Sequence, residues 1–296
     1  MNTAVVSARS QLKDYLELTK PRITLLVLVT AFAGMWLAAG GMPEPALVLF
    51  TLLGTGLASA SSAVLNNYVD RNVDKRMSRT HERALPSGRV SAAHALWFGL
   101  ALGLAAFALL IWAANALTAW LAMGTIAFYV IIYTLWLKRR SPLCTSIGGV
   151  AGALPPVIGW AAVNSGVDWP ALALFGILFL WQPPHFWALA LLRVDEYRQA
   201  GLPMLPVVRG ERATKRQMLL YTVALLPASV APFALNLTGR LYLAAALVLG
   251  VVYLARTLDF ARRPLSRPGA RTLFLFSILY LFSLFLVMFV DARGMG

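Results

Sequence analysis

PALVLFTLLGTGLASASSAVLN is the sequence of residues 45–66, and it runs directly into NYVDRNVDKRMSRT at residues 67–80. The first stretch carries no charged residue, and as a helix it is long enough to cross the ~30 Å hydrocarbon core of a bilayer, which takes about 20 residues. The second stretch is rich in acids, bases and amides. The first stretch is expected to be a helix, because a spanning segment must satisfy its own backbone hydrogen bonds. Together the two stretches predict a transmembrane helix that ends in polar groups.

Apolar runs of this kind recur along the whole chain. Hydrophobic residues make up 59% of the 296 residues, and charged residues make up 13%. The runs and the breakers between them predict spans at about residues 22–40, 45–66, 92–113, 116–137, 142–164, 170–192, 217–236, 240–258 and 272–290. The predicted fold class is therefore all-α, a polytopic membrane protein of about nine transmembrane helices, in a single domain over residues 1–296.

The basic residues predict how these helices are oriented. If the N-terminus is cytoplasmic, all of the 26 Lys and Arg residues except Arg240 and Arg293 fall on the cytoplasmic side, as the positive-inside rule requires. The C-terminus then lies outside, and the long cytoplasmic loops at residues 67–91 and 193–216 are the expected active-site loops. This topology, together with the anionic headgroups of the lipid bilayer, accounts for the formal charge of +14, so we expect no nucleic acid partner.

Asn66, Asp70 and Asp74 are spaced by four residues, which places them on one face of a helix. A carboxylate at the membrane rim carries a desolvation cost, so it is expected to have a function. One reading is a solvated network of ion pairs with the neighbouring Lys and Arg residues. The other is a Mg²⁺ site, since this ion takes carboxylate and amide oxygens and fills its shell with water and substrate phosphate. Ion pairing explains the acids but not Asn66.

A second acidic segment, Asp195-Glu196, follows the sixth predicted span and precedes a proline-containing loop. Its order of apolar helix, acids, arginine and loop is similar to that of the first segment. Two acidic helix ends facing each other across a cavity would be able to hold two metal ions and clamp a diphosphate. The sequence leaves open which of Asp195 and Glu196 binds metal, because Gln199 and Ala200 stand where a further acid would complete the set.

The run from Asn66 to Gly88 resembles the Asn-x-x-x-Asp-x-x-x-Asp signature, with trailing Arg-Thr and Pro, of the UbiA superfamily of intramembrane aromatic prenyltransferases. Other motifs are similar to the haem O synthase branch of that superfamily. They are Thr19-Lys20-Pro21-Arg22, Met77 before Arg79-Thr80, Pro184-His185-Phe186, and Glu196-Tyr197 followed by Pro203-Met204-Leu205-Pro206-Val207-Val208. The resemblance extends from about residue 15 to 290, with the motifs in the expected order on the expected side.

The resemblance implies a Mg²⁺-dependent transferase that moves a farnesyl group from farnesyl diphosphate to a vinyl carbon of haem b, with addition of water, giving haem O and diphosphate. Metal and cations would stabilise the charge left on the diphosphate. The resemblance also implies residue roles. The metal ligands are expected to be Asn66, Asp70, Asp74, Asp195 and Glu196, the catalytic residues Asp70, Asp74, Tyr133 and Lys138, the diphosphate-binding residues Arg22, Lys75, Arg79 and Arg83, and the haem-binding residue His185.

Two other activities stay open. A quinone-pathway prenyltransferase of the same superfamily would need the same metal site, and only the acceptor side, where His185 and residues 196–208 favour haem, separates the two. A transporter would carry charges near the middle of the membrane, whereas here they gather at one rim. The expected location is a bacterial inner membrane with the active site facing the cytoplasm, and haem A synthase or terminal oxidase assembly is the candidate recipient of the product.

Overall fold

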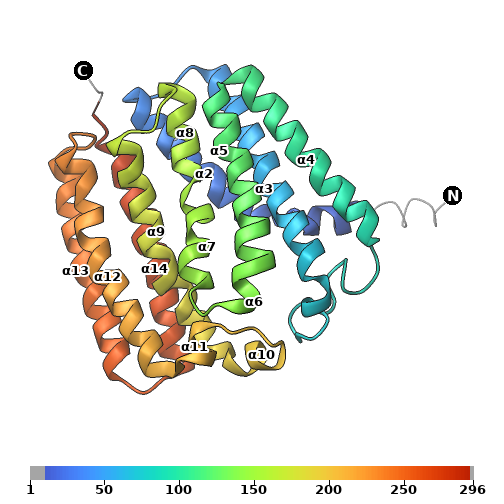
Figure 1. Cartoon of the computed structure of the whole chain (residues 1–296). Coiled ribbons are helices and arrows are strands. Elements are labelled where there is room, and N and C mark those ends of the chain that lie inside the picture. The colour runs from blue at the N-terminus through green and yellow to red at the C-terminus, as the bar shows by residue number, and fades with distance from the viewer. Residues whose placement is uncertain (1–10, 294–296) are drawn as a thin grey trace.

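The structure, a computed structural model, describes residues 11–293. It is a bundle of long helices that lie side by side (Figure 1). Within residues 11–293, nine helices are long and apolar enough to cross a membrane. The prediction of an all-α membrane protein is confirmed. The sequence predicts a single domain over residues 1–296. Residues 1–10 and 294–296 of that range lie outside the described residues.

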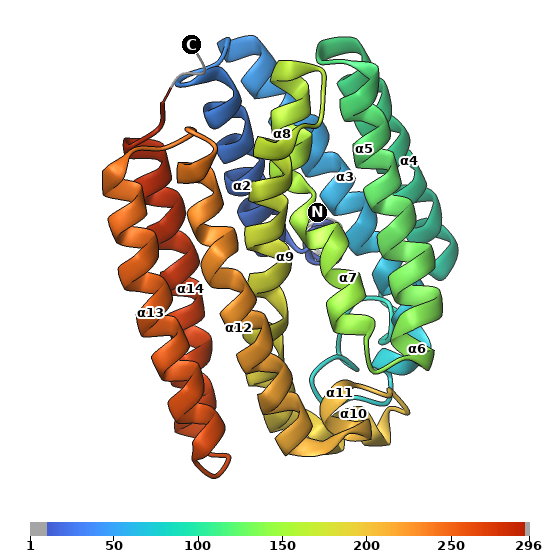
Figure 2. The ribbon, with the colours of Figure 1, turned by 60° about the vertical axis from the view of Figure 1, so that its left-hand side comes forward.

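The candidate membrane spans run over Pro21–Ala39, Pro45–Asp74, Ala92–Ala113, Ala116–Arg140, Cys144–Asn164, Trp169–Gln199, Gly210–Ala234, Arg240–Arg262 and Arg267–Val290. Their helices are α2 (Pro21–Ala39), α3 (Pro45–Asp74), α4 (Ala92–Ala113), α5 (Ala116–Ala127), η1 (Phe128–Leu137), α6 (Lys138–Arg140), α7 (Cys144–Ala153), α8 (Pro155–Asn164), α9 (Trp169–Ala190), η2 (Leu191–Arg193), α10 (Val194–Gln199), α12 (Gly210–Ala234), α13 (Arg240–Arg262) and α14 (Arg267–Val290). The short helix α11 (Leu205–Val208) lies beside α10 at the rim drawn lowest in Figures 1 and 2.

Several helices extend beyond the apolar runs that predicted them. Helix α3 continues to Asp74 instead of ending near residue 66, and α12 begins at Gly210 instead of near residue 217. The polar loops predicted at 67–91 and 193–216 are correspondingly shorter. Hydropathy marks where hydrocarbon ends, whereas a helix continues for as long as its backbone hydrogen bonds and side-chain contacts favour it. The acids at the end of α3 therefore sit on a rigid helix.

The hydrophobic core is divided between two groups of helices. One buried cluster, which includes Leu110, Ala119 and Ile158, joins α3, α4, α5 and α8. The larger cluster joins α7, α9, α12, α13 and α14, and Trp187 and Tyr280 are among its buried side chains. The outer surface of the bundle is also apolar. This is the arrangement expected of helices whose outer faces contact lipid.

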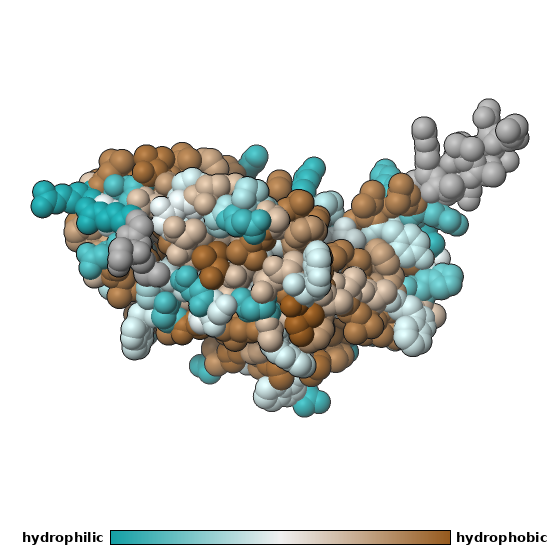
Figure 3. Space-filling view, turned by 90° about the horizontal axis from the view of Figure 1, so that it is seen from above, coloured by the Kyte–Doolittle hydropathy of each residue, from teal (hydrophilic) through white to brown (hydrophobic). Residues whose placement is uncertain are grey.

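Short connections link the helices at the rim opposite to α10 and α11. This rim faces the viewer in Figure 3, where hydrophobic residues reach across much of the surface between scattered hydrophilic groups. Large apolar side chains on the flanks, such as Leu104, Trp112 and Phe282, are well exposed. The polar and charged loops thus gather at the other rim, where the acidic end of α3 lies.

The fifth predicted span contains two helices, α7 and α8, which break at Leu154 before Pro155 and Pro156. The glycines of this span allow a neighbouring helix to approach closely. A Cβ added to Gly159 would lie 1.9 Å from the backbone oxygen of Ala31 on α2, and one added to Gly34 would lie 2.0 Å from that of Pro156. Only glycine lets α2 and α8 pack this closely.

We expect Gly159→Ala to destabilise the protein, since the new methyl group meets backbone and α2 and α8 must separate. Overpacking of this kind costs about 1–3 kcal/mol. Gly124→Ala on α5 is the matched control, because a Cβ at Gly124 meets nothing within 4 Å. Thermal unfolding in detergent should show a lower melting temperature for Gly159→Ala alone. Equal melting temperatures for the two variants would contradict the close approach.

Candidate active site

The last two turns of α3 carry three buried polar side chains. Asn66, Asp70 and Asp74 are only 5%, 3% and 5% exposed. Each carboxylate has a basic partner from another segment: the Lys138 ammonium contacts Asp70 Oδ2, and the Arg83 guanidinium donates to Asp74 Oδ2 at 2.9 Å. Asp70 and Asp74 are therefore paired inside the protein, and not in a solvated network.

Asn66 connects this pair of acids to two further helices. Its amide nitrogen donates to Asp70 Oδ2 at 3.0 Å and to Thr134 Oγ1 at 3.1 Å. Its amide oxygen accepts from Lys20 Nζ at 2.9 Å. These partners fix the orientation of the amide, because the Lys20 ammonium can only donate and the Asp70 carboxylate can only accept. The spacing of four residues correctly predicted that Asn66 and Asp70 face the same way.

Lys20 is a residue that the sequence analysis did not assign to the site. It precedes Pro21 at the start of α2 and has a left-handed backbone conformation, with φ 50° and ψ 61°. Burial, followed by the positive charges of Arg83 and Lys138, lowers the pKa of Lys20 to about 8. A non-glycine residue held in this region at a polar site is strained in a way typical of functional positions. Only its place in the Thr19–Arg22 motif could have marked it.

The partners from the fourth span are placed by a π-helix. Element η1 runs from Phe128 to Leu137 and leads directly into Lys138. It brings Thr134 opposite Asn66 and Lys138 opposite Asp70. Tyr133, predicted to act with Lys138, packs against α7, where its ring fills the space beside Gly148, and its catalytic role stays a prediction. π-helical segments often occur at functional sites.

The remaining basic residues predicted for the diphosphate lie in different surroundings. Arg79 is in the loop after α3, where partial burial and the positive charges of Arg83 and Arg193 lower its pKa. Lys75 and Arg22 are exposed, and no hydrogen bond within residues 11–293 joins either side chain to the acids. The structure thus brings Lys20, Lys138 and Arg83 to the acids, with Arg79 close by.

The second acidic segment is the helix α10, and its two acids differ. Asp195 is exposed, with 85% of its side chain accessible, and pairs with Arg198 at 2.6 Å. Glu196 is half-buried, and its Oε2 atom is buried without a hydrogen-bond partner in the described structure. The loop after α3 and the α10–α11 segment lie side by side at the same rim (Figures 1 and 2).

The oxygen atoms at the end of α3 fit a divalent cation. Asp70 Oδ1 is buried and has no hydrogen-bond partner among the described residues, and a carboxylate oxygen left without a donor is expensive unless a cation takes it. Nowhere in residues 11–293 do three His, Cys, Asp or Glu side chains converge on one point. A metal here would therefore have few protein ligands, which suits Mg²⁺ because it keeps several waters and substrate phosphates.

His185 is on α9 and faces α14. Its ring is stacked between Trp181 and Phe274, with centroids at 4.4 and 4.5 Å. Its Nδ1 atom is 2.7 Å from Ser277 Oγ, and that hydroxyl donates to Phe274 O at 2.6 Å. Because the hydroxyl proton is already committed, neutral His185 carries its proton on Nδ1 and its lone pair on Nε2.

Comparisons with known proteins identify the family of this chain. The UbiA prenyltransferase family matches residues 27–284. A protoheme IX farnesyltransferase of Gloeobacter violaceus is 48% identical over 281 residues, covering 95% of this chain and 92% of the relative. One of Aquifex aeolicus is 47% identical over 291 residues, covering 98% and 99%. The chain belongs to the UbiA prenyltransferase family. It is a membrane-embedded transferase, and the resemblance found in its motifs is confirmed.

Solved structures of UbiA-type proteins share the fold. A structure of digeranylgeranylglyceryl phosphate synthase has a TM-score of 0.81 at 18% identity and covers 95% of this chain and 98% of its own. A UbiA homolog from Archaeoglobus fulgidus bound to DMAPP and Mg²⁺ has a TM-score of 0.63 at 17% identity and covers 94% and 99%. At these identities the likeness shows the fold alone.

We expect Lys20→Met to reduce prenyl transfer by at least about tenfold, because a hydrogen bond from a charged group contributes about 1.5–3 kcal/mol. Lys13→Met is the matched control, since Lys13 is exposed. Lys20→Arg keeps the charge and should recover part of the rate. Steady-state turnover of the purified variants measures the effect. A Lys20→Met enzyme as fast as the Lys13→Met enzyme would show that Lys20 has no role in the site.

Proposed function

We propose that this protein transfers a farnesyl group from farnesyl diphosphate to a vinyl group of haem b, with addition of water, to make haem O and diphosphate. The observation that carries the proposal is the Asp70 carboxylate. It is buried, one of its oxygens has no partner in the described structure, and Lys138 contacts the other oxygen. Such a group suits a site where a metal ion and an anion meet among fixed cations.

Asp70 and Asp74, with the amide oxygen of Asn66, would hold Mg²⁺. When bound, the ion would act as a Lewis acid on the leaving diphosphate. The Asn66 amide oxygen now accepts from Lys20 Nζ, and its second lone pair would be left for the ion. Lys20 would thus lie close enough to the site to act on the diphosphate as well.

Lys20, Lys138 and Arg83 would neutralise the charge that builds up on the diphosphate. The allylic carbon–oxygen bond breaks with both electrons leaving on the diphosphate, so its negative charge grows in the transition state. Cations held in place by Asp70 and Asp74 need little reorganisation to meet that charge. Arg79, in the loop after α3, lies near Arg193, which precedes α10. It would face the same anion from that side of the site.

Glu196 is the better candidate of the two acids on α10 for a second metal ligand. Asp195 is exposed and already paired with Arg198, whereas Glu196 has a buried oxygen without a hydrogen-bond partner in the described structure. Glu196 would hold this second ion, which would add to the stabilisation of charge on the leaving group. Metal binding by Asp195 would first require its pair with Arg198 to break.

Haem is the acceptor that the relatives support. The two curated relatives cover nearly the whole chain at close to half identity, and both are called protoheme IX farnesyltransferase. The vinyl group would add its electron pair to the farnesyl cation. The carbocation that this leaves on the side chain would take up water and lose a proton, which gives the hydroxyl of haem O.

His185 would bind the haem iron through Nε2. Its Nδ1 atom is held by Ser277 and its ring by Trp181 and Phe274, so the ring is fixed with the lone pair on the other nitrogen. A hydrogen bond on the second nitrogen is the usual support of a metal-binding histidine. His185 is on α9 and Asp70 is on α3. The haem acceptor and the farnesyl diphosphate donor would therefore be bound by different helices.

The proposed setting is the inner membrane of a bacterial cell with the N-terminus and the active-site rim facing the cytoplasm. The support is the distribution of Lys and Arg, which gathers at the rim of α10 and the loop after α3. Farnesyl diphosphate would then enter from the cytoplasmic side. The product would pass to haem A synthase or to terminal oxidase assembly.

The first test is a turnover assay with purified protein in detergent, farnesyl diphosphate, haem b and Mg²⁺, read by mass spectrometry. We expect prenylated and hydrated haem, and no product after chelation of Mg²⁺. Asp70→Asn should lower the rate by at least about 10²-fold, since a metal ligand that stabilises the leaving group contributes several kcal/mol.

The control is Asp259→Asn on α13, whose carboxylate pairs with Arg263 at the surface, at 2.8 Å. It should leave the rate unchanged. Turnover of a small aromatic acceptor in place of haem would assign the protein to the quinone-pathway branch. A rate that does not respond to Mg²⁺ or to Asp70→Asn would contradict the metal site.

The second test concerns the haem ligand. We expect His185→Ala to weaken haem b binding by about tenfold or more and to remove the histidine-ligated absorption spectrum, because the iron loses its imidazole. His94→Ala is the matched control, since His94 is exposed at the start of α4. Titration of haem into each variant, followed by absorption spectroscopy, measures both effects. An unchanged spectrum in His185→Ala would contradict ligation by His185.

A further inference from the structure

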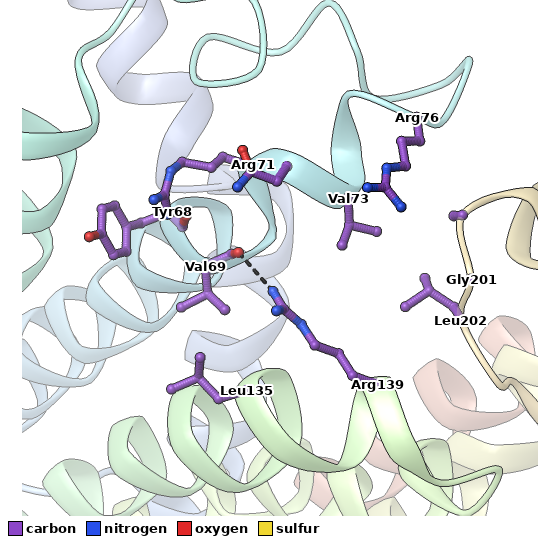
Figure 4. A pocket seen from close by; sticks show the side chains of 11 residues that line it. Tyr68, Val69, Arg71, Val73, Arg76, Leu135, Arg139, Gly201 and Leu202 are labelled. Atoms are coloured by element: carbon purple, nitrogen blue, oxygen red, sulfur yellow. Dashed lines mark hydrogen bonds between the residues drawn. The ribbon is translucent and has the colours of Figure 1, made fainter.

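A cavity with basic walls lies beside the candidate active site, on a different face of α3. It has a volume of about 480 Å³ and lies between the end of α3, the end of η1 with α6, and residues 200–202. Figure 4 shows it from close by. Its size is within the range of ~300–1,000 Å³ that is typical of ligand pockets. None of the residues proposed above to bind metal, diphosphate or haem lines it.

Three arginines from three segments line the cavity. They are Arg71 on α3, Arg76 in the turn that follows it, and Arg139 on α6. In Figure 4, Arg139 extends across the cavity toward α3 and Arg76 reaches in from the other side. The amide side chain of Asn72 also lines it. The Arg71 side chain is turned toward Tyr68, while Arg76 and Arg139 approach from the other sides. Positive charges gathered at one cavity repel one another unless something negative lies between them.

Two of these side chains are held in place by the backbone. Arg139 donates to Val69 O at 3.0 Å, and Arg71 donates to Tyr68 O at 2.6 Å while lying 4.4 Å from the centre of the Tyr68 ring. Each guanidinium keeps further N–H donors for another partner. The donors are therefore positioned before any ligand arrives, which reduces the entropy lost on binding.

No acid compensates this positive charge. Neither Asp nor Glu lines the cavity, and within residues 11–293 no ion pair includes Arg71, Arg76 or Arg139. The nearest acids along the chain, Asp70 and Asp74, are already paired with Lys138 and Arg83.

Topology alone does not explain this arrangement. The positive-inside rule requires Lys and Arg near the cytoplasmic ends of spans, and it is satisfied by side chains that extend separately into water. It does not require three of them to share one cavity, or two of them to be tied to carbonyl oxygens. Arg140 shows the contrast, since it follows Arg139 on the same helix and is equally exposed, but neither lines the cavity nor bonds to a carbonyl oxygen within residues 11–293.

We propose that Arg71, Arg76 and Arg139 form a second anion site, separate from the Asp70–Asp74 centre, that binds a phosphate or diphosphate group. The planar fork of arginine matches phosphate oxygens in pairs. Three positive charges match a diphosphate or a phosphate ester better than a single carboxylate. The site requires no metal, because cations of the protein supply all of the compensating charge.

Two sources of phosphate fit the cavity. Val69 and Arg139 are the chain neighbours of Asp70 and Lys138, so soluble diphosphate would be held within one helix face of the active site. Val73, Leu135 and Leu202 give the cavity apolar walls at the rim of the bundle, which would also accept the headgroup of an anionic phospholipid. Both use the same three arginines, and the experiment separates them.

The test uses the full chain in neutral detergent with EDTA present, so that metal-dependent binding does not contribute. Isothermal titration with sodium diphosphate is compared among the unaltered protein, Arg76→Gln/Arg139→Gln and the matched control Arg140→Gln. Native mass spectrometry then compares retention of phosphatidylglycerol and phosphatidylcholine by the same three proteins. Arg76→Gln alone is the second variant if the double variant fails to fold, since the Arg76 side chain makes no hydrogen bond within residues 11–293.

We expect the arginine variants, and not Arg140→Gln, to lose at least about tenfold in affinity for one of the two ligands, since a charge-assisted hydrogen bond contributes about 1.5–3 kcal/mol. Loss of diphosphate binding identifies the soluble source, and loss of phosphatidylglycerol with phosphatidylcholine unchanged identifies the headgroup. The proposal is overturned if neither ligand responds to the substitutions, or if Arg140→Gln has the same effect. Neither readout depends on turnover, so the result stands apart from the proposed farnesyl transfer.

Discussion

The pairing of buried carboxylates with cations from other segments is the constraint on which the active-site rim depends. Asp70 and Asp74 are nearly inaccessible to solvent, and removing one partner of a buried pair leaves an uncompensated charge that costs several kcal/mol. Lys138 comes from the fourth span and Arg83 from the loop after α3. Lys20 joins them from the start of α2 through Asn66. The acids therefore fix the positions of the start of α2, the end of the fourth span and the loop that follows α3.

The sequence predicts the parts of this rim that depend on local pattern. Nine spans follow from hydropathy, because hydrocarbon admits only helices whose length matches the bilayer. The shared face of Asn66 and Asp70 follows from the helix repeat, and their mutual hydrogen bond shows it. Lys138 was found through a motif resemblance, and the structure brings it to Asp70. In each case the sequence pattern lies within a few residues of the helix or side chain that it predicts.

The parts that escaped prediction depend on packing between distant segments. The reach of Lys20 requires a left-handed backbone before Pro21, which no local propensity favours. The π-helical turn that aligns Thr134 with Asn66 is likewise set by the neighbouring helix. Asp195 and Glu196 are adjacent in sequence, and only the fold makes one exposed and the other half-buried. Residue type and spacing give no information about any of these choices.

Paired and unpaired charges lie on different sides of the end of α3. On one side the acids are matched by basic partners, so their net field is small. On the other side three arginines have no acid partner in the described structure, so their positive field extends into the rim. A polyanion approaching the bundle is thus attracted first by the uncompensated face. With a metal ion bound at the acids, as proposed, the anion would gain a stronger set of contacts there, and this difference would draw it from the arginines toward the acids.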